Sequence, residues 1–161
     1  MTLTYELFRT FLEQWALYRR DEFQYYFPLK GGWEQWVQAD YAAYVLRQST
    51  TFDILREVAI YQNAYQRVDW LFNNDDIDVA KKIAVEIKCQ SFNNWNAFIA
   101  GVEADMEKVD QDNLNDEFEG CTTVVMGIYF ENNARSWMKR NGFNEVFING
   151  EIGIAIRKMY P

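Results

Sequence analysis

The chain has 161 residues, of which 49% are hydrophobic and 17% aromatic, enough for the core of one domain, and its net charge is −8. It contains no histidine, which excludes Ser-His-Asp and Cys-His catalysis as well as histidine metal sites. Cys89 and Cys121 form neither a Cys-x-x-Cys pair nor a zinc quartet, so both are expected to be buried free thiols.

No apolar run approaches the roughly 20 residues that span a bilayer. The first fifteen residues lack the basic start and small-residue cleavage site of a signal peptide. The sequence therefore predicts a cytoplasmic protein without a membrane partner. Export as an effector, by a machine that ignores signal peptides, stays open.

The negative charge is concentrated in one segment. Residues 103–119, called here the acidic segment, hold eight acids against one base, Lys108, which gives −7 and leaves −1 for the rest of the chain. The favoured interpretation is a solvated helix surface, and the alternative is a surface for a protein partner. A polyanion could still approach over basic pairs such as Lys81 with Lys82 and Lys139 with Arg140.

The N-terminal third is predicted to be helical. Residues 3–25 carry apolar side chains at helical spacing, which indicates a first helix. Pro28 and the Gly31-Gly32 pair end this region, and a second helix is expected from Trp33 to Gln48.

The following region changes to the pattern of strands. Three apolar runs at 55–61, 66–73 and 81–89 have short connections, so they predict an antiparallel meander. Trp95, Phe98, Val102, Met106 and Val109 then recur at spacings of three and four, which predicts an amphipathic helix whose exposed face carries most of the acidic segment.

The C-terminal part alternates between strand and helix. An apolar strand at 121–130, buried on both faces, precedes a short helix at 131–142 that ends at Gly142. Two closing strands are joined by a type I′ turn at Asn149 and Gly150. The predicted fold is one α/β domain over 1–161, an α+β sandwich with a mixed central sheet flanked by helices, in which residues 1–50 are helical and 54–161 form the sheet core.

Polar residues interrupt two of the predicted strands. Asp69 lies within RVDWLF, and Glu86, Lys88 and Gln90 share one face of IAVEIKCQ because side chains alternate along a strand. Carboxylates suit a hard cation such as Mg²⁺, and a nearby lysine can hold a water or a phosphate oxygen. This pattern predicts metal-assisted hydrolysis of a phosphodiester. The structural alternative is an Asp69–Lys88 ion pair with Glu86 facing water.

These motifs resemble the PD-(D/E)XK nuclease superfamily, which has the restriction-endonuclease-like fold, and the resemblance covers residues 31–130. The Asp of the family's second strand matches Asp69, and its Glu-x-Lys matches Glu86 and Lys88. Glu34 matches the glutamate of the preceding helix, and Gln90 matches a glutamine found in several branches. The family's proline before the aspartate is missing, because Val68 takes that place.

The resemblance implies a role for each matched residue. Glu34, Asp69, Glu86 and the carbonyl of Ile87 would hold Mg²⁺, with Mn²⁺ as a substitute. Lys88 would orient the attacking water and stabilise charge, and Gln90 would hydrogen-bond that water or the substrate. Arg67, on the same strand face as Asp69, would grip a phosphate or pair with a site carboxylate.

A compact chain of this kind fits a DNA endonuclease or DNase of toxin or defence type, by analogy. RNA as the substrate and a homodimeric state both stay open. The alternative function is a catalytically silent acidic binding protein on the same fold, either an immunity protein or a partner-binding subunit, with the acidic segment as its contact surface.

Overall fold

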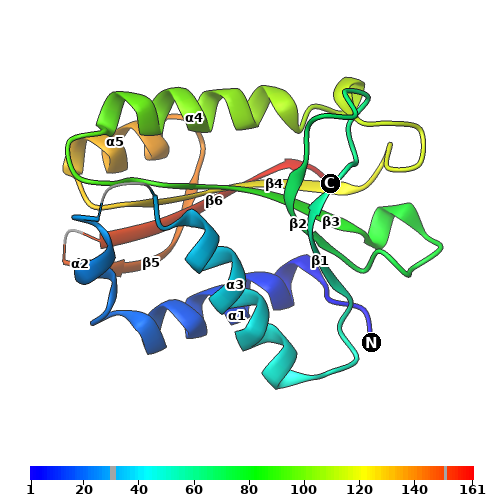
Figure 1. Ribbon diagram of the computed structural model, residues 1–161, viewed down its shortest axis with the longest axis horizontal. Helices are drawn as coiled ribbons and strands as arrows, with labels where there is room; N and C mark the ends of the chain where they lie inside the picture. The colour runs from blue at the N-terminus through cyan, green and yellow to red at the C-terminus, as the bar shows by residue number, and fades with distance from the viewer. Residues whose placement is uncertain (30–31, 151) are drawn as a thin grey trace.

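The computed structural model describes residues 1–29, 32–150 and 152–161; Gly31, expected to end the first helical region together with Gly32, lies outside them. Six strands form one mixed sheet in the order β1-β2-β3-β4-β6-β5 (Figure 1). β3 and β4 are parallel, and all the other neighbours are antiparallel. The strands are β1 (Ile54–Val58), β2 (Val68–Phe72), β3 (Ile83–Cys89), β4 (Thr122–Tyr129), β5 (Asn144–Asn149) and β6 (Ile152–Tyr160).

Helices cover both faces of this sheet, which confirms the α/β class (Figure 1). One face packs against α1, α2 and α3, and the other packs against α4 and α5. Among the described residues, no helix has the length and apolar character needed to cross a bilayer. The helices are α1 (Tyr5–Arg19), α2 (Phe23–Tyr26), α3 (Glu34–Gln48), α4 (Trp95–Lys108) and α5 (Asn132–Arg140).

The prediction of one unbroken helix over residues 3–25 is wrong. The Thr4 side chain accepts a hydrogen bond from the Leu7 N–H and begins α1, but the chain turns between Arg20 and α2. This turn brings Phe23 back against Trp15, with 5.4 Å between ring centroids, and buries it completely. Packing of one aromatic ring therefore outweighs continuation of the helix.

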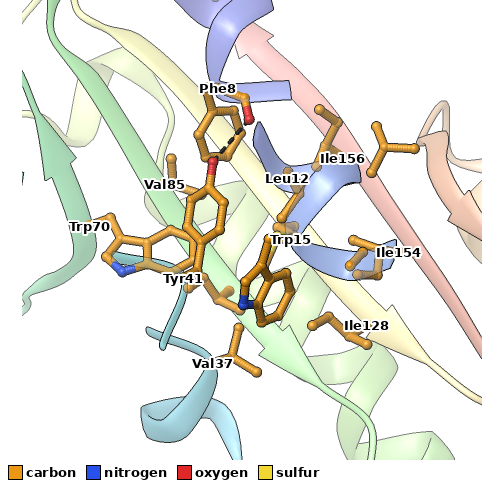
Figure 2. Close-up of a cluster of buried hydrophobic side chains, with 14 of the residues drawn as sticks. Phe8, Leu12, Trp15, Val37, Tyr41, Trp70, Val85, Ile128, Ile154 and Ile156 are labelled. Carbon is orange, nitrogen blue, oxygen red and sulfur yellow. Dashed lines mark hydrogen bonds between the residues drawn. The ribbon is translucent and has the colours of Figure 1, made fainter. Parts of the chain in front are cut away.

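The core between α1, α3 and the sheet is rich in aromatic side chains, and Figure 2 shows its centre. Each buried aromatic with a polar tip has a partner for that tip, as burial requires. The Tyr41 hydroxyl donates to the Phe8 carbonyl at 2.9 Å, and the Trp15 indole N–H donates to Asp40 at 2.7 Å. Arg19 reaches the same Asp40 carboxylate with two further hydrogen bonds, which ties α1 to α3.

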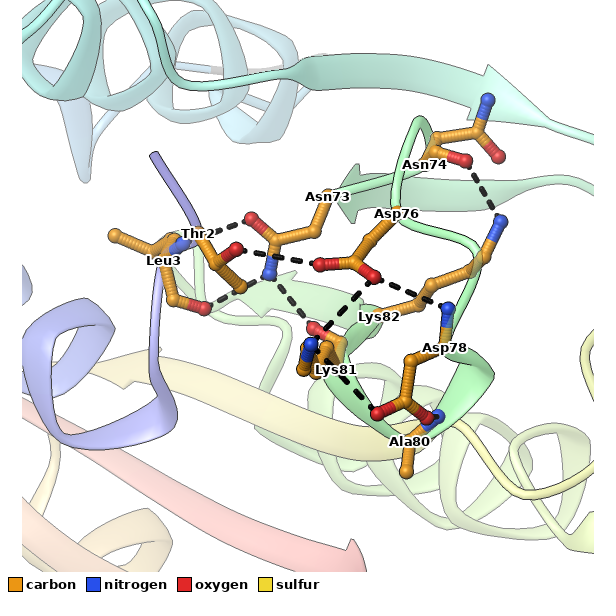
Figure 3. A network of polar contacts seen from close by, with 9 residues as sticks. All are labelled: Thr2, Leu3, Asn73, Asn74, Asp76, Asp78, Ala80, Lys81 and Lys82. Carbon is orange, nitrogen blue, oxygen red and sulfur yellow. Dashed lines mark hydrogen bonds and ion pairs between the residues drawn. The ribbon is translucent and has the colours of Figure 1, made fainter.

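The N-terminus is fixed to the turn after β2 by Asn73 (Figure 3). Its side-chain amide accepts from the Leu3 N–H and donates to the Leu3 carbonyl, both at 2.8 Å, and it also donates to the Lys81 carbonyl. Asn73 is 2% exposed and has φ +58°, a left-handed conformation that asparagine tolerates better than most residues. One side chain thereby joins three segments.

The meander β1-β2-β3 was predicted correctly, but its pairing is incomplete. The β2–β3 register ends at Trp70 opposite Val85, whereas β3 continues beside β4 as far as Cys89 opposite Ile128. The last four residues of β3 therefore have a strand neighbour on one side only. This half-open stretch carries the candidate site.

We expect Asp40→Asn to lower the free energy of unfolding by about 1–3 kcal/mol near neutral pH, because Arg19 loses its charged partner. Burial raises the pKa of Asp40, but hydrogen bonds from Arg19 and Trp15 outweigh burial and hold this pKa below its usual value. A depressed pKa stabilises the folded state above the pKa of the unfolded chain, so the gap between wild type and variant should close as pH falls below about 4. Urea unfolding at several pH values measures this gap. Asp21→Asn, at an exposed acid, should show no such gap.

Candidate functional site

Two carboxylates take the place of the missing strand beside the end of β3. The Ile87 N–H donates to Asp69 Oδ2 at 2.7 Å, and the Cys89 N–H donates to Glu34 Oε2 at 3.2 Å. Asp69 comes from β2, and Glu34 is the first residue of α3. The N–H and C=O of one strand residue point to the same neighbour, so the Ile87 carbonyl also faces the Asp69 side. Three of the predicted groups therefore meet at this edge.

Glu86 lies on the face of β3 that α4 covers. It is 2% exposed, so the alternative in which it faces water is wrong. Its Oε1 accepts a hydrogen bond from the Tyr61 hydroxyl and lies 2.8 Å from Lys108 Nζ. Tyr61 follows β1, and Lys108 is the last residue of α4. Neither of these partners was predicted for the site.

Lys88 points the same way as Glu86 and lies between two other acids. Its Nζ is 3.4 Å from Glu34 Oε1 and 3.3 Å from Asp105 Oδ2, so these two acids, in place of the expected Asp69, form its ion pairs. Its aliphatic stem packs under α4, where a Cβ on Gly101 would come within 2.9 Å of Lys88 Cδ. The absence of a side chain at Gly101 gives the lysine room to reach both acids.

Asp105 is a site residue that the sequence reasoning missed. It was placed on the exposed face of α4 with the rest of the acidic segment, but it is 6% exposed and turned toward the sheet. Its Oδ2 is buried without a hydrogen bond of acceptable geometry, although Lys88 lies at ion-pair distance. The spacing gave a signal, because Phe98, Val102 and Asp105 are three and four residues apart and share one helix face.

Glu34, Asp69, Glu86 and Asp105 lie close enough for their charges to interact. The charge of Asp69 acts on each of the other three. Burial, followed by the charges of Asp69 and Asp105, raises the pKa of Glu86 to about 8. Burial also raises the pKa of Asp105 to about 6, against the effect of Lys88. The pKa of Glu34 is raised chiefly by burial, with a further contribution from Asp69.

The lysine responds in the opposite sense. Burial lowers the pKa of Lys88, but the charges of Asp105, Glu34 and Asp69 outweigh burial and raise it above its usual value.

Asp69 itself accepts from Gln38 Nε2 at 2.7 Å, and Arg56 donates to the same Gln38. Three of the acids, Glu34, Glu86 and Asp105, form ion pairs with the two lysines, and Asp69 is held by neutral donors. The acid–lysine cluster is defined as Glu34, Asp69, Glu86, Lys88, Asp105 and Lys108.

The side chains of Gln90 and Arg67 form their hydrogen bonds outside this cluster. Gln90 is fully buried, and its Oε1 accepts from the N–H groups of Phe130 and Glu131 while its Nε2 donates to Glu131. It therefore joins the ends of β3 and β4. Arg67 donates to the carbonyls of Ala64 and Gln66 in its own exposed loop.

A hollow opens at the Glu34 end of the cluster. Its volume is about 320 Å³, and Lys88 and Glu34 line it together with the start of α4. The side chains of Lys88 and Glu34 remain 26% and 30% exposed, so solvent reaches this end, whereas Glu86 lies deeper. The hollow is further lined by Gly32, Cys89, Ser91, Phe92, Asn94, Ala97 and Phe98.

The donor chemistry of the cluster fits a hard divalent cation, because its ligands are carboxylate oxygens, a backbone carbonyl and one buried carboxylate oxygen without a hydrogen bond. In the present arrangement, however, the carboxylates are engaged by protein groups and are not placed as metal ligands. Within residues 1–29, 32–150 and 152–161, no group of three or more acidic or cysteine side chains is placed to hold a metal ion. Lysine, tyrosine and backbone N–H groups occupy the carboxylates instead.

Comparison of the chain with protein-family models, curated proteins and solved structures finds no match.

We expect Gln90→Ala to destabilise the fold, because two backbone N–H groups at the end of β4 lose their acceptor. The loss should be about 1–3 kcal/mol for each buried group left unpaired. Chemical denaturation measures it, with Gln66→Ala at an exposed glutamine as the control. A variant as stable as wild type would contradict the structural role.

Proposed function

We propose that this protein hydrolyses phosphodiester bonds in a nucleic acid, DNA first, with the help of a divalent metal ion at the acid–lysine cluster. The observation that carries the proposal is the charge of the cluster. The largely buried cluster holds four acids and two lysines, so two negative charges lack a compensating cation when all four acids are ionised, and the raised pKa of Glu86 reflects burial as well as this shortage of positive charge. Unpaired buried charge costs several kcal/mol, and one divalent cation would compensate it completely. Perturbed acids beside a hollow are also typical of functional sites.

Asp69, Glu86 and the Ile87 carbonyl are the groups that would hold the ion, with Glu34 at the solvent end. The ion would activate a water molecule and neutralise charge on the scissile phosphate. Lys88 has an ammonium group at the rim of the hollow, where it would orient a phosphate oxygen and stabilise negative charge. Its raised pKa keeps it cationic at neutral pH, so it serves as a charge and not as a base.

The topology supports the resemblance to PD-(D/E)XK nucleases. The chain runs from α3 through the meander β1-β2-β3 to α4 and then to β4, which lies parallel to β3. Asp69 and Glu86 lie on adjacent strands, one residue beyond the last Trp70–Val85 pair. A restriction-endonuclease-like core is therefore part of the proposal. A DNase of toxin or defence type follows only by analogy with that family.

A second candidate is an acidic binding protein on the same fold. One observation favours this second candidate: each of the four acids already contacts a protein donor. The cluster can therefore persist as a buried ion-pair network without a metal. The acidic segment would then be the contact surface for a basic partner. The two candidates predict different effects when a carboxylate is removed: loss of cleavage for the hydrolase, and loss of stability for the binding protein.

We expect the purified protein to nick or degrade plasmid DNA with Mg²⁺ or Mn²⁺ and to stop when EDTA is added. Glu86→Gln, Asp69→Asn and Lys88→Met should each lower the cleavage rate by about 100-fold or more, because each removes a group that faces the cation or the phosphate. Gel electrophoresis of the DNA measures the rate. The same assay on an RNA substrate decides between the nucleic acids.

Glu103→Gln is the matched control, since it removes an exposed acid from α4 and should leave cleavage unchanged. Melting temperatures separate the candidates. Loss of cleavage with the fold retained supports the hydrolase. No metal-dependent cleavage by the wild type, combined with strong destabilisation of Glu86→Gln, would support the binding protein.

A further inference from the structure

α4 contributes two inward-facing side chains to the cluster. Neither belongs to the sequence motif of Asp69, Glu86 and Lys88 from which the site was predicted. Asp105 is buried and reaches the Lys88 ammonium, and Lys108, one turn later, reaches Glu86. The rest of the acidic segment on α4, Glu103 and Glu107, is exposed. The helix therefore presents an acid and a base to the sheet and acids to the solvent.

The position of Lys108 is the informative feature. Its Nζ lies 2.8 Å from Glu86 Oε1, donates to the Arg67 carbonyl at 2.6 Å, and lies 5.0 Å from the centre of the Tyr61 ring. A carboxylate, a carbonyl oxygen and an aromatic face are all partners for a cation. Lys108 thus fills a small cation-binding environment at the deep end of the cluster.

Asp105 supplies the second observation. Its side chain is 8% exposed, and its Oδ2 is buried without a hydrogen bond. A buried carboxylate oxygen in this state is costly unless a cation completes its coordination. Lys88 at 3.3 Å supplies charge but no well-directed hydrogen bond.

We propose that Asp105 is a ligand of the divalent cation together with Glu86 and Asp69, and that the Lys108 ammonium is a resident cation which the metal displaces. Displacement needs only rotation of a flexible side chain that is already 19% exposed at the helix end. It exchanges one positive charge at Glu86 for two, which halves the net negative charge of the cluster, from −2 to −1 when all four acids are ionised. The site that is closed in this structure would open by that exchange.

This inference rests on the proposed function for the identity of the ion, but binding of the ion tests it without catalysis. We expect Asp105→Asn to weaken Mn²⁺ binding by about tenfold or more and Lys108→Met to strengthen it by about the same factor, since partners of metal ligands commonly change affinity by 10–100-fold. Electron paramagnetic resonance of free Mn²⁺ during titration measures the affinity. Glu103→Gln, at an exposed acid of the same helix, should bind as wild type does.

The melting temperature with and without Mn²⁺ keeps the test decisive if a variant is less stable, because an ion that binds only the folded state raises it. Lys108→Met should gain more from Mn²⁺ than wild type does, and Asp105→Asn should gain less. Equal Mn²⁺ affinity in all four proteins would overturn the roles of Asp105 and Lys108, while DNA cleavage that depends on Glu86 would keep the proposed function. Absence of Mn²⁺ binding in every protein would overturn this inference, and the cleavage assay would then judge the function separately.

Discussion

The candidate site depends on one constraint, the early separation of β2 from β3. Beyond Val85, two β3 N–H groups, those of Ile87 and Cys89, face the side that β2 has left. A buried backbone N–H must have an acceptor, and here the acceptors are the carboxylates of Asp69 and Glu34. An acceptor is thus required at each of these places for the strand itself, before any chemistry is considered, and the Asp69 and Glu34 carboxylates supply it.

Placing acids there creates the second requirement, which is compensation of their charge. Glu86 and Asp105 are both almost fully buried near Asp69, and burial first, with repulsion from Asp69 added to it, raises the pKa of both groups. Lys88 and Lys108, at the two ends of the cluster, compensate part of this negative charge. Each ionised group taken from water costs several kcal/mol, so the remaining imbalance favours either a proton on Glu86 or an added cation. The same arrangement therefore serves as strand support and as a cation-binding environment.

The sequence predicted what depends on periodicity and could not predict what depends on strand separation. The meander, α4 and the fully buried β4 follow from spacing of apolar residues, and all three are present. Glu34, Asp69 and Glu86 lie around the end of β3 beside Lys88, where they contact lysine, tyrosine and backbone N–H groups. The resemblance implied that Gln90 hydrogen-bonds the attacking water or the substrate, but the chain leaves β3 at Cys89 and the Gln90 side-chain amide turns toward the end of β4. Tyr61 and Lys108 reach Glu86 only through tertiary packing, which leaves no local pattern.

Net charge is a weaker objection to a polyanionic substrate than the sequence suggested. Five of the eight acids of the acidic segment lie at or beyond Asp110, past the C-terminal end of α4, whereas the hollow opens beside Phe98 near its beginning. The ten residues of helix from Phe98 to Lys108 alone separate these points by about 15 Å. Because the screening length at physiological ionic strength is about 8 Å, repulsion from those five acids is strongly reduced at the hollow. A phosphate approaching the hollow meets Lys88 and the start of α4 first, and there the positive end of the helix dipole opposes the charge of Glu34.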